Sequence, residues 1–333
     1  MDLNISLLKR NVESYSEVKQ IGNTDIFVVK YKPTDDTFAL RKTNLKEYRD
    51  LEIFENETNL TNRLKHKNLL TFISSFIAKS QLWTIMPFAE FRSMADLSKP
   101  FGLREEAVSL VIKDVLQAVK YLHNNCIIHH SIRGSHILLF GSPETEFRCI
   151  LSGLKYSINT IRNGRIVTPV FDYPIGAELN LNWLATEVLE QNLYGYETKA
   201  DIYSIGITCC ELSNGAIPFG EMEAADVLLN KVNGEIPEPL DCNSDLGMTD
   251  IQLSEMNEHQ KLVYNACLQK RFSPDFKRFT SEACLHPEPH KRLNALQLLD
   301  HSFIKRYEHL DKTKVIMESI RINQLPEEIR KLV

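Results

Sequence analysis

The chain has 333 residues, of which 43% are hydrophobic and 25% are charged, so it has an ordinary globular balance and enough length for two cores. Its formal net charge is −5, so we expect no binding to nucleic acid or to an anionic membrane surface. No apolar run approaches the roughly 20 residues that span a bilayer, and the start of the chain is too short and polar for a signal peptide. The seven cysteines show no zinc-ligand spacing, so we expect reduced thiols, no metal site and a cytoplasmic or nuclear location.

The first third of the chain predicts a small β-sheet with one helix. Residues 15–43 alternate in polarity and are rich in Val, Ile, Phe and Tyr, which is typical of strands. Residues 47–65 carry apolar side chains at helical spacing. Two further apolar stretches, residues 69–77 and 81–88, predict two more strands. Together these elements predict a small β-rich lobe.

The pattern becomes helical after Phe91. Residues 104–124 predict a long amphipathic helix, and the nearly continuous apolar run at 199–214 predicts a buried one. The polar residues 241–259 predict an exposed loop. The expected fold class is α+β, with a small β-rich lobe followed by a larger helical lobe. We expect an N-terminal extension, the small lobe, the large lobe and a C-terminal tail at residues 1–14, 15–90, 91–310 and 311–333.

One loop of the larger lobe stands where an active site would be expected. Residues 126–129 (CIIH) and 137–140 (ILLF) predict two short strands, and active-site loops are often held between rigid elements in this way. The connecting residues 130–136 (HSIRGSH) contain no carboxylate and no amide. The loop therefore has the position of a catalytic loop without a carboxylate to act as its base.

Several motifs, taken in order, resemble those of eukaryotic protein kinases. Residues 201–206 (DIYSIG) resemble the buried helix start D-x-W-S-x-G, and residues 183–187 (WLATE) resemble the A-P-E motif. Arg292 stands where that family pairs an arginine with Glu187. The resemblance covers about residues 15–310 and implies a bilobal protein-kinase-like fold. It also implies structural roles for charged residues: Glu57, Glu187, Asp201 and Arg292.

Within that resemblance, the positions that carry out phosphoryl transfer are substituted. Ser131 stands at the catalytic Asp, and His136 stands at the Asn that helps to hold Mg²⁺. Leu151 begins the triplet Leu-Ser-Gly and stands at the metal-binding Asp of D-F-G. Arg41 stands at the strand-three Lys. The helix Glu that pairs with that Lys is retained as Glu57, which predicts an ion pair with Arg41.

These substitutions predict a pseudokinase and not an enzyme. A general base contributes about 10²–10⁴-fold to a rate, and Ser131 cannot act as one at neutral pH. Neither an aliphatic side chain nor an imidazole suits Mg²⁺, so we expect His136 to stabilise the loop and bind no metal. The alternative is an active or weakly active sterile-twenty-like Ser/Thr protein kinase with unorthodox catalytic residues, for which Asp172 would supply a carboxylate.

The sequence leaves nucleotide binding open. No cofactor is required, but ATP could bind without Mg²⁺, because apolar residues remain at the adenine positions and guanidinium groups suit phosphates. Against this, only Gly22 of the Gly-rich loop remains, and Thr24 and Phe27 stiffen the loop. The apolar residues could equally be core. The candidate nucleotide-binding residues are Val29, Ala39, Arg41, Met86, Ala89, Arg133 and Leu138.

The combination of substitutions resembles the STRAD pseudokinases of the sterile-twenty-like branch. The resemblance rests on Leu-Ser-Gly at residues 151–153, the S-x-x-x-x-H loop at 131–136, and Arg41. It implies a closed, active-like shape that binds and allosterically activates a Ser/Thr protein kinase of the liver-kinase tumour-suppressor type. It also implies a helical-repeat scaffold resembling mouse protein twenty-five, and a partner that moves from nucleus to cytoplasm.

Two features near the C-terminus bear on these partners. Residues 326–333 lack the Trp-Glu-Phe tripeptide with which we would expect such a family to dock its scaffold, so docking would need other surfaces. Residues 315–320 (VIMESI) are apolar enough to lie in a partner's groove, or to pack on the chain's own large lobe.

Overall fold

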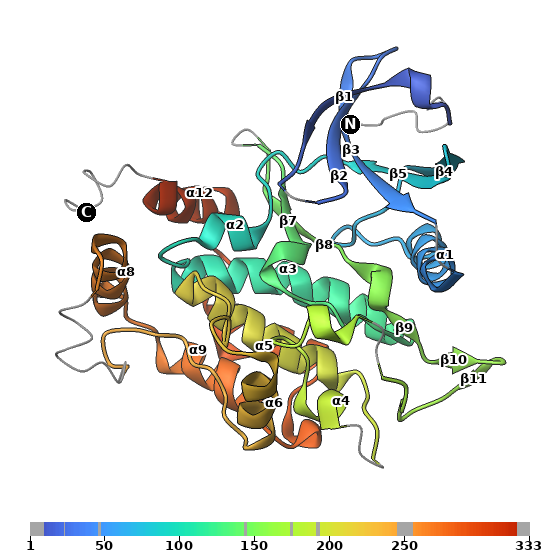
Figure 1. The fold of residues 1–333 in the computed structure, drawn as a ribbon. Helices are drawn as coiled ribbons and strands as arrows, with labels where there is room; N and C mark the ends of the chain where they lie inside the picture. Colours follow the sequence, from blue (N-terminus) through green and yellow to red (C-terminus); the bar gives the residue numbers. More distant parts are fainter. Residues whose placement is uncertain are drawn as a thin grey trace. The chain divides into compact units, whose positions relative to one another are not determined.

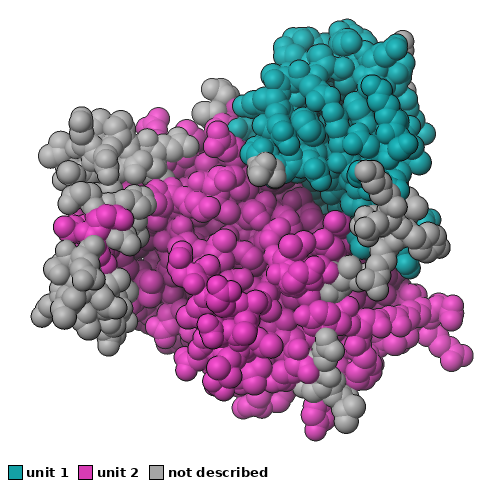
Figure 2. All heavy atoms as spheres, in the orientation of Figure 1, with its two compact units in different colours: residues 1–90 teal, residues 91–333 magenta. Residues whose placement is uncertain are grey.

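The chain folds into two compact units, each with its own core. A computed structural model describes residues 10–22, 24–45, 48–142, 145–173, 176–190, 194–244 and 256–324. Unit 1 is Met1–Glu90 and unit 2 is Phe91–Val333 (Figure 2). No helix among these described residues is both long enough and apolar enough to cross a membrane.

Unit 1 is a five-stranded antiparallel sheet with one helix (Figure 1). The sheet order is β1-β2-β3-β5-β4. Its elements are a short 3₁₀ helix η2 (Val12–Ser14), β1 (Tyr15–Gln20), β2 (Ile26–Tyr31), β3 (Asp36–Asn44), α1 (Tyr48–Arg63), β4 (Ser74–Ala78) and β5 (Gln81–Pro87). The strand predicted for 69–77 was placed too early, because Leu69, Leu70 and Phe72 are buried in non-strand backbone before β4 begins. Burial gives those residues the same apolar signal as a strand.

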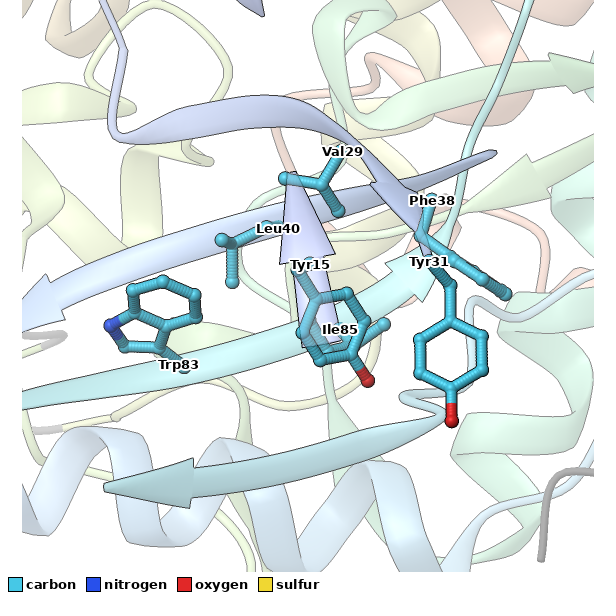
Figure 3. Packing of buried hydrophobic residues seen from close by; sticks show 7 residues of the cluster. All are labelled: Tyr15, Val29, Tyr31, Phe38, Leu40, Trp83 and Ile85. Carbon is cyan, nitrogen blue, oxygen red and sulfur yellow. The ribbon is translucent and has the colours of Figure 1, made fainter. Parts of the chain in front are cut away.

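The register of the strands separates two faces of this sheet. Cross-strand partners lie on the same face, and successive residues alternate between faces. One face carries the core cluster shown in Figure 3, which comprises Tyr15, Val29, Tyr31, Phe38, Leu40, Trp83 and Ile85. On the other face, Ala39 pairs with Val28 and Met86, and two residues along β3, Arg41 pairs with Thr84.

Unit 2 is mainly helical, with short two-stranded ribbons (Figure 1). Its first elements are α2 (Met94–Ser98), α3 (Glu105–Asn124), β6 (Ile127–Ile128), η3 (Gly134–His136), β7 (Ile137–Phe140), β8 (Arg148–Leu151), η4 (Leu154–Tyr156), β9 (Ile158–Asn159), β10 (Ile161–Arg162), β11 (Arg165–Ile166) and η5 (Ala177–Leu179). The later ones are α4 (Thr186–Glu190), α5 (Lys199–Asn214), α6 (Ala224–Val232), α8 (Glu258–Gln269), α9 (Pro274–Arg278), η6 (Phe279–Cys284), η7 (Pro289–Lys291), α10 (Ala295–Leu299), α11 (Ser302–Tyr307) and α12 (Lys312–Gln324).

The core of unit 2 is built around α3 and α5, close to the predicted bounds. α3 is amphipathic, whereas nearly all of α5 is buried. Gly206 of α5 allows a close approach, since an added Cβ would lie 2.6 Å from Cγ of Leu285. The strand predicted for 126–129 is shorter, because only Ile127 and Ile128 pair with β9. Of the predicted loop at 241–259, residues 245–255 lie outside the described residues, and α8 begins at Glu258.

The C-terminal helix α12 packs on its own unit. Ile316 and Ile320 are buried, and α12 contacts α2 and α3. The Lys312 ammonium lies 2.9 Å from both carboxylate oxygens of Asp114 on α3. Of the two predicted roles of residues 315–320, packing on the large lobe is therefore the one observed. Residues 326–333 lie outside the described residues.

Candidate functional site

The loop between β6 and β7 is closed on itself by hydrogen bonds around His136. Nδ1 of His136 lies 2.7 Å from the carbonyl oxygen of Ser131 and 3.1 Å from its hydroxyl, and Nε2 lies 3.2 Å from a guanidinium nitrogen of Arg133. The Ser131 hydroxyl donates to Oδ1 of buried Asn180 at 3.1 Å. Nδ1 thus donates and Nε2 accepts, which is the neutral form of imidazole. These bonds link Ser131, Arg133 and His136 within the loop, and the loop-stabilising role of His136 stays a prediction.

Asp201, in the first turn of α5, anchors the start of this loop. Its carboxylate accepts from the backbone N–H groups of His129 and His130 at 2.8 and 2.9 Å, and lies 2.8 Å from Nε2 of His123. Burial alone would raise the pKa of Asp201, but the hydrogen bond and the nearby imidazoles lower it to about 2. The carboxylate therefore stays ionised and holds the loop backbone in place.

Two buried imidazoles begin the loop. Nε2 of His129 lies 3.1 Å from the carbonyl oxygen of Ser152, and Nδ1 accepts from the Ser131 N–H at 3.1 Å. The two ring nitrogens of His130 have no hydrogen-bond partner among the described residues, and its ring centroid lies 5.0 Å from that of Tyr196. Burial lowers the pKa of each of the two histidines to about 4, so both rings are neutral at neutral pH.

β8 brings residues 151–153, the triplet predicted to stand at the D-F-G position, against the loop. Leu151 pairs with Ile137 of β7 and is 1% exposed. The N–H and the hydroxyl of Ser152 donate to the carbonyl oxygen of His136 at 2.8 and 3.0 Å. Gly153 has a φ of +90°, and a Cβ there would lie 2.6 Å from Nδ1 of His136. The glycine is therefore required by the close approach of the imidazole.

The chemistry available at these positions differs from that of phosphoryl transfer. Ser131, His136 and Leu151 present a hydroxyl, an imidazole and an aliphatic chain, whereas Mg²⁺ takes oxygen ligands such as carboxylates. In the part of the chain that the structure describes, no group of three or more His, Cys, Asp or Glu side chains is arranged to hold a metal ion. Asp172, the carboxylate that the enzyme alternative would need, is 55% exposed and paired with Arg162.

In unit 1, the predicted ion pair between Arg41 and Glu57 is present. The two guanidinium nitrogens of Arg41 lie 3.2 and 2.5 Å from the two carboxylate oxygens of Glu57. Glu57 is 2% exposed, and the guanidinium lies 5.5 Å from the ring centroids of both Phe54 and Phe72. This bidentate pair, flanked by aromatic rings, fixes α1 against β3.

The strand register of unit 1 replaces one of the candidate nucleotide-binding residues, Val29, by its neighbour Val28. Ala39 and Met86 lie on the sheet face that carries Arg41, but Val29 lies on the opposite face, in the core cluster (Figure 3). Val28 is the β2 residue that shares their face. A one-residue shift in alignment moves a strand residue to the other face, which is why a motif match selected Val29. Ala89 is partly exposed after β5.

The Gly-rich-loop region of unit 1 is tied by Thr24. Its hydroxyl donates to the carbonyl oxygen of Ile21 at 2.6 Å and accepts from the N–H of Ile26 at 3.2 Å. Gly22 has a φ of +55°, and Asn23 lies outside the described residues. The bonds are consistent with the stiffening expected from a side chain in place of glycine.

In unit 2, Leu138 and Arg133 are both engaged by the protein. Leu138 is half-buried on β7 and pairs with Ile150 of β8. Arg133 donates to the carbonyl oxygen of Leu179 at 3.1 Å, and its guanidinium carbon lies 5.4 Å from the ring centroid of Trp183. An anion would therefore have to compete with the carbonyl and with the imidazole of His136 for this guanidinium.

The predicted pair between Glu187 and Arg292 is buried and fully bonded. The two carboxylate oxygens of Glu187 lie 2.6 and 3.0 Å from the terminal guanidinium nitrogens. Nε of Arg292 donates to the carbonyl oxygen of His286, and the terminal nitrogens also donate to those of Lys199 and Pro287. All five N–H groups of the arginine are thus satisfied.

Sequence reasoning missed Lys231 of α6 as an organising residue. Its ammonium donates to the carbonyl oxygens of Leu181, Asn182 and Leu184 at 3.0, 2.8 and 2.7 Å, and the residue is 1% exposed. Burial lowers its pKa to about 7. No local pattern marks such a residue, because a single lysine in an amphipathic helix predicts a solvated side chain. Asn180 was missed because a single Asn outside a helix or strand carries no signal of the distant hydroxyl from which it accepts.

Comparison with known proteins identifies the family. A model of the protein kinase domain matches residues 15–304. The STE20-related kinase adapter protein alpha of Rattus norvegicus is 34% identical over 309 residues, which are 86% of this chain and 77% of the relative. The alpha protein of Homo sapiens is 33% identical over 314 residues, covering 86% and 70%. The beta protein of Homo sapiens is 29% identical over 337 residues, covering 93% and 79%.

These matches confirm two predictions from the sequence, the α+β protein-kinase-like fold and the resemblance to STRAD-type pseudokinases. The relatives are named kinase adapter proteins, which agrees with the absence of a carboxylate among residues 130–136. The chain has the protein kinase domain fold and belongs to the family of STE20-related kinase adapter proteins.

Proposed function

We propose that this chain is a pseudokinase that binds a Ser/Thr protein kinase of the liver-kinase tumour-suppressor type and activates it allosterically, without transferring phosphate itself. The observation that carries the proposal is the rebuilt loop, in which Ser131 and His136 bond to one another and Leu151 is part of the core. Membership of a family of kinase adapters supports the role of binding partner.

The partner kinase docks, in this proposal, on the face of unit 2 to which residues 161–173 and 176–179 contribute exposed apolar side chains. Ile166 is 64% exposed, Phe171 61% and Leu179 58%. Large exposed apolar side chains of this kind occur at protein-binding surfaces. Contact through this face would let the chain stabilise one conformation of the partner and so shift its population.

Reconstitution with the partner kinase tests this. The activity of the purified partner is measured on a peptide substrate with and without this chain, and we expect activation to be lost in the double variant F171D/L179D. The matched control is L296D, since Leu296 of α10 is 51% exposed and lies outside that face. Activation that survives in F171D/L179D would exclude this face as the docking site.

The enzyme alternative has its own test. This chain is incubated alone with labelled ATP, a peptide substrate, and Mg²⁺ or Mn²⁺. We expect no transfer, because Ser131 and Leu151 supply neither a base nor a metal ligand. Turnover that disappears in R41A would show that the chain is itself an active kinase and would end the pseudokinase proposal.

We also propose that a helical-repeat scaffold resembling mouse protein twenty-five completes the complex, and that the complex is distributed between cytoplasm and nucleus. The family resemblance supports both statements. Co-purification of the tagged chain from cells tests for the scaffold. Nuclear and cytoplasmic fractionation of cells with and without this chain tests for the distribution of the complex. An unchanged nuclear fraction of the partner kinase after removal of this chain would contradict the effect on localisation.

We propose separately that ATP binds without a metal ion. The apolar residues support this binding, whereas the arginines do not. Val28, Ala39 and Met86 keep an apolar sheet face suited to an adenine base. The two arginines are less available to the phosphates of ATP. Arg41 is paired with Glu57, and Arg133 bonds to a backbone carbonyl and to an imidazole. A thermal shift with ATP in the presence of EDTA measures binding, and no shift would overturn it.

A further inference from the structure

A groove in unit 2 is lined by prolines and tyrosines. It lies between α4, α6 and the turn that contains η7, and its volume is about 740 Å³. That volume lies in the range of about 300–1,000 Å³ found for sites that hold ligands. In Figure 1, α4 and α6 lie next to each other in unit 2. The rings that line the groove belong to Pro169, Tyr194, Tyr196, Tyr203, Pro287 and Pro289.

The cations of the groove face protein oxygens. The Lys231 ammonium donates to three backbone carbonyls, and the Lys199 ammonium donates to the carbonyl oxygen of Arg292. Burial lowers the pKa of Lys231 to about 7, which removes part of its positive charge at neutral pH. Glu187, which also lines the groove, is paired with Arg292. The interior therefore offers little uncompensated charge to a ligand.

The rim, by contrast, is acidic. Glu190, Glu197 and Glu235 line the groove and are exposed. His290 also lies at the rim, 3.3 Å from the carboxylate of Glu288. The apolar walls reach the surface as well, since Tyr194 is 83% exposed and Val232 is 48% exposed. An apolar channel with carboxylates along its edge is complementary to an apolar chain with positive ends.

We propose that this groove binds an extended, proline-containing peptide segment of another protein, flanked by Lys or Arg. Polyproline II segments have no internal hydrogen bonds and lose little conformational entropy on binding, and they dock into grooves lined by aromatic rings. The carboxylates of Glu197 and Glu235 attract the basic flanks. The groove adjoins the exposed apolar face at Pro169, but its test uses short peptides and variants of Glu197 and Glu235, so its outcome does not depend on the proposed function.

Selection from a phage-displayed library of random short peptides tests this inference on the full chain. We expect enrichment of peptides that combine Pro or aliphatic residues with Lys or Arg. Enriched peptides are then synthesised with a fluorescein label and titrated by fluorescence anisotropy. The charge-reversal variant E197K/E235K should weaken binding about tenfold, and added NaCl should weaken it in the wild-type chain.

Two further variants complete the test. V232D places a carboxylate on the apolar wall and should also weaken binding, whereas E221K reverses an exposed charge outside the groove and should leave it unchanged. Thermal melts of all variants show that they remain folded. No enrichment, enrichment of acidic peptides, or equal affinity for wild type, E197K/E235K and V232D would each overturn the inference.

Discussion

Two polar regions of unit 2 differ in the charge of their side chains. Around Asp201 and between Glu187 and Arg292, buried ionised groups are retained and nearly every donor has an acceptor. Around Ser131, His136 and Leu151, these three side chains are uncharged, and the two polar ones bond to one another, to Arg133 and to Asn180. The comparison separates the charges that hold the fold from those that phosphoryl transfer would need. The first set is kept, and the second is replaced by groups that fix a shape.

The largest expected effect is on the charged region. R292A leaves the Glu187 carboxylate buried without its partner, and we expect a loss of about 3–5 kcal/mol in the free energy of unfolding. Urea denaturation followed by tryptophan fluorescence measures it in a W83F background, because Trp183 then remains as the single tryptophan and reports on unit 2.

The matched control is R278A, which removes an exposed arginine paired with a partly exposed carboxylate, Asp275. Its unfolding midpoint should equal that of the background chain. Similar midpoints for R292A and R278A would show that the buried pair does not hold this unit together.

A charge added to the region around Ser131, His136 and Leu151 should destabilise the fold. L151D places a carboxylate at a residue that is 1% exposed and has aliphatic neighbours on β7. We expect it to cost about 3 kcal/mol in the free energy of unfolding, whereas L151M should cost about 1 kcal/mol. The same fluorescence measurement applies. If L151D were as stable as L151M, packing would not be what excludes an acid here.

Acid should destabilise the junction between the two regions. The pKa values of His129 and His130 are about 4 in the folded chain and 6.5 in a model peptide. Between these values the unfolded state binds more protons, so stability is full above pH 6.5 and is lost as pH falls towards 4. Each histidine should contribute a slope of about 1.4 kcal/mol per pH unit.

The variant H130F isolates one of these contributions. It keeps a ring against Tyr196 and removes a side chain whose nitrogens have no hydrogen-bond partner in the described part of the chain. Unfolding free energies at several pH values between 7 and 5 should show a shallower dependence for H130F than for the wild type. Equal slopes would mean that His130 does not titrate as its burial requires.

The smallest expected effect concerns the bonds inside the loop. H136A removes the imidazole that links Ser131 to Arg133, and we expect a loss of about 1 kcal/mol in the free energy of unfolding. Amide hydrogen exchange of Ser131 and Gly153 should become faster. H290A, at a side chain that is 75% exposed, is the control and should change neither quantity. No change in H136A would contradict the loop-stabilising role.

The parts of this protein that follow from local patterns were predictable. The helices at 105–124 and 199–214 have strong apolar signals, and the pairs Arg41–Glu57 and Glu187–Arg292 follow from motif positions. The start of β4 was not predictable, because Leu69, Leu70 and Phe72 are apolar residues that are buried outside a strand. A local pattern also could not choose between Val28 and Val29, because that choice depends on the strand register.

The sequence by itself determined the family and the two-part architecture, because these depend on residue types in a fixed order. The assignment of the substituted catalytic positions stays a prediction from motif matches. Only the tertiary structure decided what the substituted residues do, such as the closure of the loop by His136, Ser131 and Asn180, and the capture of three carbonyls by Lys231. The physical reason is range. Local propensity and periodicity act over a few residues, whereas hydrogen bonds that join positions nearly fifty residues apart exist only once the whole unit has folded.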